Sequence, residues 1–259
     1  MSLPDLLLAT GLVITGSMVA LWLVSLAVRD ASIVDPFWGT GFTIVTWTAV
    51  AVVGDWSAHD LVLAALVSVW GSRLSLYLLW RNLGKDEDYR YQAMRRHWGT
   101  RFWIISLGTV FLLQGVLVWL VSLPVQVAVL APGDPGVLTA AGIVIWLVGL
   151  TFETVGDAQL ARFKADPANA GKVMDRGLWR YTRHPNYFGD FCVWWGIYVV
   201  ALDASGTVWT VIGPLVMSFL LLRVSGVAML ERTISKRRPG YEEYARRTNA
   251  FFPGPVRKA

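Results

Sequence analysis

The chain has 259 residues, of which 55% are hydrophobic and only 16% are charged. Soluble globular domains carry about 25% charged residues, so this composition disfavours a soluble protein and favours an integral membrane protein. The net charge of +5 could indicate nucleic-acid binding, but the placement of the charges favours a membrane topology and an anionic small molecule instead.

Tryptophan and cysteine set two further limits. The fourteen tryptophans suit a membrane protein, because indole rings settle at membrane–water interfaces. Cys192 is the single cysteine, so an internal disulfide is excluded.

Seven apolar runs approach the roughly 20 residues with which a helix crosses a bilayer. The first run lacks the basic residues that open a signal peptide, and we expect it to remain as a helix. We therefore predict an all-α integral membrane protein in which residues 1–259 form a single domain. The predicted spans are residues 3–28, 37–53, 61–80, 102–123, 137–163, 187–201 and 207–230.

Lysine and arginine are unevenly distributed among the segments between these spans. Of the 23 basic residues, 20 fall in segments 81–101, 162–183 and 232–258. The alternate segments, 54–60, 124–136 and 202–206, contain none. Because basic loops remain in the cytoplasm, this alternation predicts an external N-terminus and a cytoplasmic C-terminus.

Four charged residues lie inside predicted spans, where a charge is costly and usually faces a cavity or a partner. Arg73 lies in the third span and Arg223 in the seventh. Glu153 and Asp157 are four residues apart in the fifth span and share one helical face. Ion pairs among them could simply hold the helices together. We interpret them instead as the lining of a polar pocket that opens to the cytoplasm.

Two further polar residues lie at the second span and inside the fourth span, and each has a purely structural explanation. Asp35, in SIVDPFWG, either caps the second helix, with Pro36 at its first position, or presents a carboxyl group to a substrate cavity. Gln114, in FLLQGVLVW, could serve only to hydrogen-bond a neighbouring helix.

The segment RGLWRYTRHPNYFGD, residues 176–190, joins a basic loop to the sixth span. Gly177 allows a tight turn, and Pro185 suits the first turn of a helix. A helix N-terminus attracts anions, and the amide and carboxyl side chains here can bind amides and hydroxyls, whereas a merely solvated basic loop needs only Lys and Arg. We therefore predict a seat for a phosphorylated or carboxylated cofactor. Its polar side chains are Arg180, Tyr181, Arg183, His184, Asn186 and Asp190.

A second basic cluster follows the last span. Glu231 begins it, and residues 236–238 could meet the phosphates of a cofactor or of anionic lipids. Tyr241 and Tyr244 are three residues apart and share a helical face. We expect this tail to fold back over the pocket.

The motifs GLWRYTRHPNYFGD, RRPGYEEYARRTNAFFP and SIVDPFWG together resemble the steroid 5α-reductase C-terminal superfamily. The chain looks most like the bacterial branch with seven spans, long labelled as a domain of unknown function. This superfamily also holds sterol reductases and, more distantly, isoprenylcysteine carboxyl methyltransferases. The resemblance implies NADPH bound from the cytoplasmic side, mainly by residues 149–259, in a bacterial plasma membrane. A lipid substrate would enter from the bilayer, membrane lipids would surround the chain, and we expect a monomer that binds no nucleic acid.

The resemblance also implies roles for individual residues. Asp35, preceded by Val34, stands where the family has a ketone-binding Gln–Glu pair, while Trp70 and Tyr77 are the two positions that match the family's tyrosine. The implied catalytic residues are Asp35, Tyr77 and Trp70. No metal is expected. The implied cofactor-binding residues are Arg73, Glu153, Asp157, Lys164, Lys172, Arg180, Tyr181, Arg183, His184, Asn186, Asp190, Arg223, Glu231, Tyr241 and Tyr244.

Three functions remain open at this point. The first is NADPH-dependent reduction of the C4–C5 double bond of a 3-oxo-Δ4 steroid or a similar lipid enone, with hydride passing to the β carbon and Asp35 polarising the ketone oxygen. The second is methyl transfer from S-adenosylmethionine, since RHP-x-Y-x-G also occurs in the isoprenylcysteine enzymes. Asp190, directly after that glycine, favours reduction, because sterol-reductase relatives read GD there. The third is a lipid-binding scaffold with no nicotinamide site.

Overall fold

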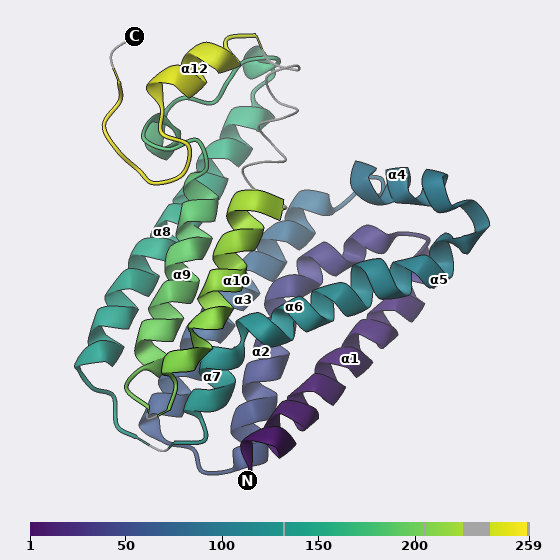
Figure 1. The fold of residues 1–259 in the computed structure, drawn as a ribbon. Coiled ribbons are helices and arrows are strands. Elements are labelled where there is room, and N and C mark those ends of the chain that lie inside the picture. The colour runs from purple at the N-terminus through teal and green to yellow at the C-terminus, as the bar shows by residue number, and fades with distance from the viewer. Residues whose placement is uncertain (132, 205, 225–238, 258–259) are drawn as a thin grey trace. The chain divides into compact units, whose positions relative to one another are not determined.

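A computed structural model describes residues 1–131, 133–204, 206–224 and 239–257. These residues are helical and contain no β-strand, which confirms the predicted all-α class (Figure 1). The α-helices are α1 (Leu3–Val28), α2 (Val34–Val53), α3 (Ala58–Asn82), α4 (Tyr89–Trp98), α5 (Phe102–Ser106), α6 (Leu113–Val121), α7 (Leu123–Ala128), α8 (Val137–Ala165), α9 (Pro185–Ala201), α10 (Ile212–Phe219) and α12 (Tyr241–Arg247). Short 3₁₀ turns lie at Ala31–Ile33, Gly99–Arg101, Pro167–Asn169, Gly177–Arg180 and Val208–Val211, and π-helical stretches at Leu107–Leu112 and Leu220–Val224.

Five of the described helical segments are long and apolar enough to cross a membrane. They coincide with the first five predicted spans, and many of their large apolar side chains face outward, as lipid contact requires: Leu8 and Leu12 of α1 are 62% and 64% exposed. The chain is therefore a multi-pass membrane protein. The sixth predicted span is the 17-residue helix α9. The seventh is helical over Val208–Val224, and its remainder lies outside the described residues.

The chain divides into two compact units. The first unit comprises Met1–Thr139 and Val200–Gly213, and the second comprises Ala140–Val199 and Pro214–Ala259.

Helices α2 and α3 of the first unit cross at a pair of glycines. A Cβ atom on Gly39 would lie 2.1 Å from the carbonyl oxygen of Gly71, and one on Gly71 would lie 2.4 Å from that of Gly39. Small residues let two membrane helices approach until their backbones touch. This crossing fixes the start of α2, which carries Asp35, against α3.

The fourth span of the first unit is longer than the sequence predicts. Helical structure begins at Tyr89, ahead of the apolar run, and continues to Val121. It passes through the π-helical stretch Leu107–Leu112, which ends two residues before Gln114. A π-helical turn shifts the register of a helix, and such turns often occur at functional sites.

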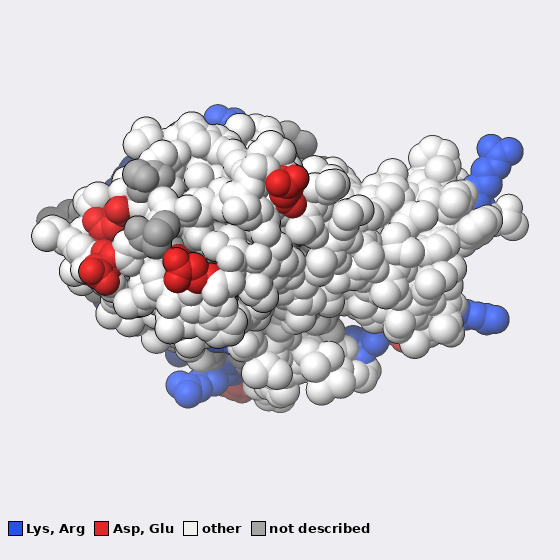
Figure 2. All heavy atoms as spheres, turned by 90° about the horizontal axis from the view of Figure 1, so that it is seen from below, with Lys and Arg blue, Asp and Glu red and all other residues white. Residues whose placement is uncertain are grey.

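One end of the first unit gathers the loops that lack basic residues. Ser57 and Asp60 form a capping box at the start of α3. Asp203 accepts hydrogen bonds from the backbone N–H of Gly136 at 3.0 Å and from the N–H and hydroxyl of Thr139 at 2.6 Å each. Figure 2 views this end, where acidic side chains lie on the face and the visible Lys and Arg side chains lie toward its edges. The sequence assigns these loops without Lys and Arg to the external side, and this orientation stays a prediction.

Helices α8 and α9 of the second unit run side by side with their backbones in contact. A Cβ atom on Gly149 would lie 2.6 Å from the carbonyl oxygen of Gly189, and one on Gly196 would lie 2.7 Å from the backbone nitrogen of Trp146. Glycines seven residues apart on each helix thus form the contact stripe. The contact positions the first turn of α9, which begins at Pro185 as predicted, against the acidic face of α8.

Candidate functional site

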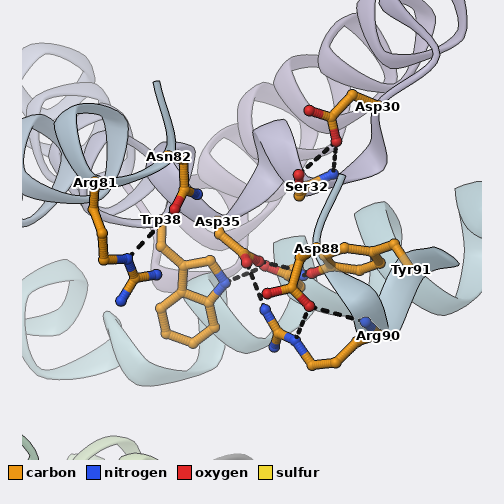
Figure 3. A network of polar contacts seen from close by, with 10 residues as sticks. Asp30, Ser32, Asp35, Trp38, Arg81, Asn82, Asp88, Arg90 and Tyr91 are labelled. Atoms are coloured by element: carbon orange, nitrogen blue, oxygen red, sulfur yellow. Dashed lines mark hydrogen bonds and ion pairs between the residues drawn. The ribbon is translucent and has the colours of Figure 1, made fainter. Parts of the chain in front are cut away.

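Asp35 lies at the centre of a polar cluster in the first unit (Figure 3). Its Oδ1 accepts a hydrogen bond from the Tyr91 hydroxyl at 2.7 Å, and its Oδ2 accepts one from Nη2 of Arg90 at 2.6 Å. The Asp35 side chain is 16% exposed and that of Arg90 is 35% exposed. A carboxylate this well covered needs a cation and hydrogen-bond donors, and Arg90 and Tyr91 supply them.

Gln114 of α6 extends this cluster. Its Nε2 donates to the Tyr91 hydroxyl at 3.4 Å, and its Oε1 accepts from the indole N–H of Trp38. The Gln114 side chain therefore does bond a neighbouring helix, α2, but it also reaches the hydroxyl that bonds Asp35. We call Asp35, Arg90, Tyr91, Gln114 and Trp38 the Asp35 network.

The alternative in which Asp35 caps the second helix is wrong. Helix α2 begins at Val34, its cap residue is Ile33, and no side chain makes the cap hydrogen bond. The preceding turn Ala31–Ile33 is capped by Asp30, whose Oδ1 accepts from the N–H of Ser32 at 2.8 Å. Because this turn leads directly into α2, Asp35 falls inside the first helical turn and its side chain is available to Tyr91.

The loop before α4 holds Arg90 and Tyr91 in place. Asp88 caps α4 by accepting from the backbone N–H of Arg90 at 2.9 Å, and the same oxygen accepts from Nε of Arg90 at 2.8 Å. Burial acts to raise the pKa of the Asp88 carboxyl group, but these hydrogen bonds outweigh it and leave the pKa below its ordinary value. Asp88 therefore remains ionised and helps to orient the guanidinium of Arg90 toward Asp35.

Glu87 ties this loop to the connection between α1 and α2. Its carboxylate accepts from the N–H of Ala31 at 2.9 Å and from Nη2 of Arg95 at 2.8 Å. Burial acts to raise the pKa of the Glu87 carboxyl group. The hydrogen bonds from Arg95 and Ala31 lower this pKa by more than burial raises it, so the pKa lies below its ordinary value.

The other predicted catalytic residues lie on α3. Trp70 is fully buried, with its ring 5.4 Å from that of Phe42, and Phe42 in turn lies 5.4 Å from Trp38 of the Asp35 network. Among these ring contacts, Trp70 therefore contacts the Asp35 network through the ring of Phe42. Tyr77 lies 5.3 Å below the guanidinium of Arg73, which the sequence assigned to the cofactor. A catalytic role for Trp70 or Tyr77 stays a prediction.

The second unit brings together several residues predicted to bind the cofactor. Nδ2 of Asn186 donates to Oδ1 of Asp157 at 3.1 Å, which joins α9 to α8. Asp157 and Glu153 are both buried, on α8. His184 is buried as well, and its ring stacks on that of Tyr187 at 5.6 Å. This arrangement places an acid and an amide together beside the start of α9, and a role for them in cofactor binding stays a prediction.

The C-terminal tail packs against the basic loop, whereas its closure over a cofactor pocket stays a prediction. The Thr182 hydroxyl donates to the carbonyl oxygen of Phe251 at 2.6 Å, and the N–H of Arg183 donates to the carbonyl oxygen of Asn249 at 2.9 Å. Phe251 and Phe252 pack edge-on against aromatic rings of α9. Residues 182 and 249 also form an isolated parallel bridge. The tail is thus part of the same structure as the loop.

Two of the predicted cofactor residues take part in this packing. Nη1 of Arg183 donates to the carbonyl oxygen of Ala245 at 2.7 Å, and the Tyr244 hydroxyl donates to that of Trp179 at 2.5 Å. Burial raises the pKa of Tyr244, so its hydroxyl remains a donor. The Tyr241 ring lies 5.8 Å from that of Tyr244, as expected for one helical face. These contacts give Arg183 and Tyr244 a role in holding the tail, and a role in binding the cofactor stays a prediction.

The remaining predicted cofactor residues are less enclosed. Lys164, Lys172, Arg180, Tyr181 and Arg223 are exposed, Asp190 is half-buried on α9, and Glu231 lies outside the described residues. Arg223 lies in the π-helical stretch Leu220–Val224. Within the described ranges, no group of three His, Cys, Asp or Glu side chains is placed to hold a metal ion.

Four residues were missing from the sequence-based site. Tyr91 and Arg90 lie in a polar segment that looks like a loop in the sequence, with no spacing that relates it to Asp35. Arg176 and Arg247 line a cavity with Arg180. Arg176 opens the segment 176–190 and Arg247 lies in the tail, but nothing in the sequence relates these two positions to each other. A signal for Arg90 and Tyr91 was the cluster of polar and aromatic residues in DYRYQ, residues 88–92, between the third and fourth predicted spans.

Comparison with known proteins gives three relatives with curated names. The chain is 25% identical over 269 aligned residues to an uncharacterized protein, C594.04c, of Schizosaccharomyces pombe, covering 90% of this chain and 75% of that protein. It is 27% identical over 140 residues to the nickel-cobalt-cadmium resistance protein NccN of Alcaligenes xylosoxydans xylosoxydans, covering 52% of this chain and 63% of that protein. It is 42% identical over 55 residues to the "Probable O-methyltransferase ustE" of Ustilaginoidea virens, covering 21% of this chain and 19% of that protein.

No solved structure matches the chain. Residues 21–248, most of the chain and both the Asp35 network and the basic loop, match one protein family. The chain therefore belongs to the family described as "Protein of unknown function (DUF1295)".

Proposed function

We propose that this protein reduces the conjugated double bond of a lipid enone, such as a 3-oxo-Δ4 steroid, with NADPH as the hydride source. The observation that carries the proposal is the 2.7 Å hydrogen bond between the Tyr91 hydroxyl and Asp35, with Arg90 against the other carboxylate oxygen. Membership of a family that includes steroid 5α-reductase-like members also supports it.

The Asp35 network supplies what such a reaction requires at the ketone oxygen. Negative charge develops on this oxygen when hydride reaches the β carbon, and a positioned proton donor lowers the energy of that state. The phenol of Tyr91 can donate directly, or Asp35 can donate in its protonated form. Gln114 orients the hydroxyl, and Arg90 compensates the carboxylate once a proton has left the pair. The resulting enol returns its hydroxyl proton to the pair while a proton from water adds to the α carbon, and the net addition of one hydride and one proton gives the saturated ketone.

The second unit offers groups that fit NADPH. Asn186, bonded to Asp157, presents an amide suited to a carboxamide, and arginines of the basic loop suit phosphates. NADPH, when bound, supplies the hydride. The residues of this chain bind it, orient it and, with the aromatic side chains of α9 and the tail, exclude water.

A membrane setting accords with a lipid substrate. The apolar outer faces of α1 and its neighbours would let the substrate enter from the bilayer. We place the active site on the cytoplasmic side of a bacterial plasma membrane, because the basic segments adjoin the proposed cofactor residues.

Methyl transfer from S-adenosylmethionine is the second candidate. It is favoured by the 42% identity over 55 residues to the "Probable O-methyltransferase ustE". Methyl transfer would give the Asp35–Tyr91 pair no role in catalysis. S-adenosylmethionine also carries no phosphate that the arginines of the basic loop could bind. These two points favour reduction.

One experiment separates the two functions. The detergent-purified protein is incubated with a 3-oxo-Δ4 steroid and NADPH, or with S-adenosylmethionine and an isoprenylated cysteine, and the products are analysed by mass. Reduction adds two hydrogens, and we expect it to fall in Asp35→Asn but not in Asp86→Asn, an exposed acid of the nearby loop. Thermal stabilisation by S-adenosylmethionine and not by NADP⁺, with a methylated product, contradicts the reductase proposal.

A further inference from the structure

A cavity of about 380 Å³ in the second unit is rich in arginine. It lies near the low end of the range of about 300–1,000 Å³ for small-molecule pockets. Three arginines and one aspartate are among its lining residues, an excess of two positive charges. We call it the arginine hollow, and its lining residues are Asp175, Arg176, Gly177, Arg180, Arg247, Thr248 and Val256.

The turn that carries Arg176 and Arg180 is fixed to helix α8. Gly177 has a φ of +59°, a backbone conformation that residues with a side chain rarely adopt. A Cβ atom at this position would also lie only 2.4 Å from Nε2 of Gln159. The Gln159 side chain accepts a hydrogen bond from the N–H of Leu178 at 2.9 Å. Both arginines therefore project from a turn of defined geometry.

The tail brings the third arginine to the same place. Arg247 ends helix α12, whose Tyr244 hydroxyl bonds the carbonyl oxygen of Trp179. The carbonyl oxygen of Arg247 accepts from the N–H of Arg257 at 2.9 Å, so the chain on both sides of it is held. Arg247 thus lines the same cavity as Arg176 and Arg180, although it lies about 70 residues away from them in sequence.

Arg247 already has an anionic partner inside the hollow. Its Nη2 lies 2.6 Å from Oδ2 of Asp175, and the two side chains are 36% and 37% exposed. An ion pair this exposed contributes little to stability, because water screens it. The carboxylate of Asp175 is thus bound only weakly to the guanidinium of Arg247, and an anion that binds arginine more tightly can displace it.

We propose that the arginine hollow binds a phosphate group and that Asp175 is a built-in competitor which yields Arg247 when phosphate binds. Arginine pairs with phosphate through two parallel hydrogen bonds, and three arginines can satisfy the oxygens of one phosphomonoester. The phosphate belongs either to the dinucleotide cofactor or to a lipid headgroup. The cofactor source rests on the proposed function, whereas the binding of phosphate itself does not.

Binding is tested by thermal stabilisation of the purified full chain with inorganic pyrophosphate, NADP⁺, NAD⁺, dihexanoyl phosphatidate and dihexanoyl glycerol. NADP⁺ and NAD⁺ differ only in one phosphate group. Dihexanoyl phosphatidate and dihexanoyl glycerol also differ only in one phosphate group. We expect NADP⁺ to bind more tightly than NAD⁺ if the cofactor is the source, and phosphatidate more tightly than the glyceride if a lipid is. Arg247→Gln should weaken binding roughly tenfold or more, the loss expected for one charge-assisted contact.

Two variants distinguish binding from simple ion pairing. Asp175→Asn frees Arg247 and should tighten phosphate binding several-fold; if Asp175 only stabilises the fold, this variant melts earlier and its affinity is unchanged. Arg246→Gln removes a neighbouring exposed arginine of α12 that does not line the hollow and should bind as the unchanged protein does. The proposal is overturned if no phosphate compound stabilises the protein or if Arg246→Gln loses as much affinity as Arg247→Gln. Phosphate binding without enone turnover retains this proposal and contradicts the proposed reaction.

Discussion

Tyr91 and Asp35 are 56 positions apart in sequence, yet the Tyr91 hydroxyl donates to Oδ1 of Asp35 at 2.7 Å. The phenol is buried and the carboxylate is nearly so, and Arg90 compensates the charge. In the proposed reduction, a phenol and an acid held together in this way would donate a proton from a geometry that is set before any substrate arrives.

Removing the phenolic oxygen tests the role of this pair directly. We expect Tyr91→Phe to lower the turnover of an enone by about 100-fold or more, since general acid catalysis contributes about 10²–10⁴-fold. Stabilisation by NADP⁺ should be unchanged. Tyr89→Phe, two residues earlier and 55% exposed, is the matched control and should turn over normally. Equal turnover in both variants would remove Tyr91 from the mechanism.

The glycine crossing of α2 and α3 predicts a large loss of stability. In Gly39→Ala the new methyl group would meet the carbonyl oxygen of Gly71 at 2.1 Å, so the two backbones must separate. We expect a loss of about 3 kcal/mol or more, at or above the upper end for overpacking, seen as a lower melting temperature in detergent. Gly16→Ala in α1 has open space around the added Cβ and should be neutral or slightly stabilising. Equal melting temperatures for the two variants would show that the crossing tolerates a side chain.

Glu87 predicts a specific dependence of stability on pH. Its pKa in the folded protein lies below the ordinary value of 4.5, so its ionised form stabilises the fold above about pH 5. This contribution is lost as the pH falls through 4.5 toward the folded pKa, and because the group is only partly buried it amounts to at most about 1 kcal/mol. Glu87→Gln should be less stable near pH 7, and its melting temperature should fall less between pH 5 and pH 4.

The control for this change is Asp86→Asn, which removes the adjacent exposed carboxyl group. Melting curves of all three proteins are compared from pH 7 to pH 4. A Glu87→Gln curve parallel to that of the unchanged protein would show that the hydrogen bonds from Arg95 and Ala31 do not depend on the charge of Glu87.

The predicted orientation in the membrane can be tested with cysteine labelling. The native Cys192 is buried, so it contributes little background. A membrane-impermeant maleimide should label Asp55→Cys in intact cells and Asp86→Cys only after the membrane is opened, because the loop with Asp86 is basic and that with Asp55 is not. The reverse order of labelling would invert the topology and place the proposed cofactor residues outside.

The helices could be predicted because their signal is local. A run of about 20 apolar residues suffices to define a span, so the first predicted span has the bounds of α1, and the fifth ends two residues short of α8. The start of the fourth span was missed because Tyr89–Trp98 is polar and carries no such signal. The start of α2 was missed because a 3₁₀ turn leads into it.

The site was predictable in parts. Gly177 and Pro185 lie at the turn and the helix start that their backbone preferences require. The hydrogen-bond partners of Arg183 and Tyr244 could not be predicted from the sequence. Each side chain donates to a backbone carbonyl oxygen more than 60 residues away, and a carbonyl oxygen that accepts such a bond has no sequence signature. The same reason hid Tyr91 as the partner of Asp35. Only tertiary packing brings these groups together.

The make-up of the arginine hollow has a consequence for biosynthesis. Arg176 and Arg180 leave the ribosome well before Arg247 and Val256, and two further apolar segments, residues 187–201 and 207–230, lie between them in the sequence. A nascent chain that stops after α9 holds two of the three arginines and none of the tail that positions the third. Phosphate binding as proposed for the hollow would therefore require the chain through Val256, and it would serve as a readout of whether the C-terminal segments have folded.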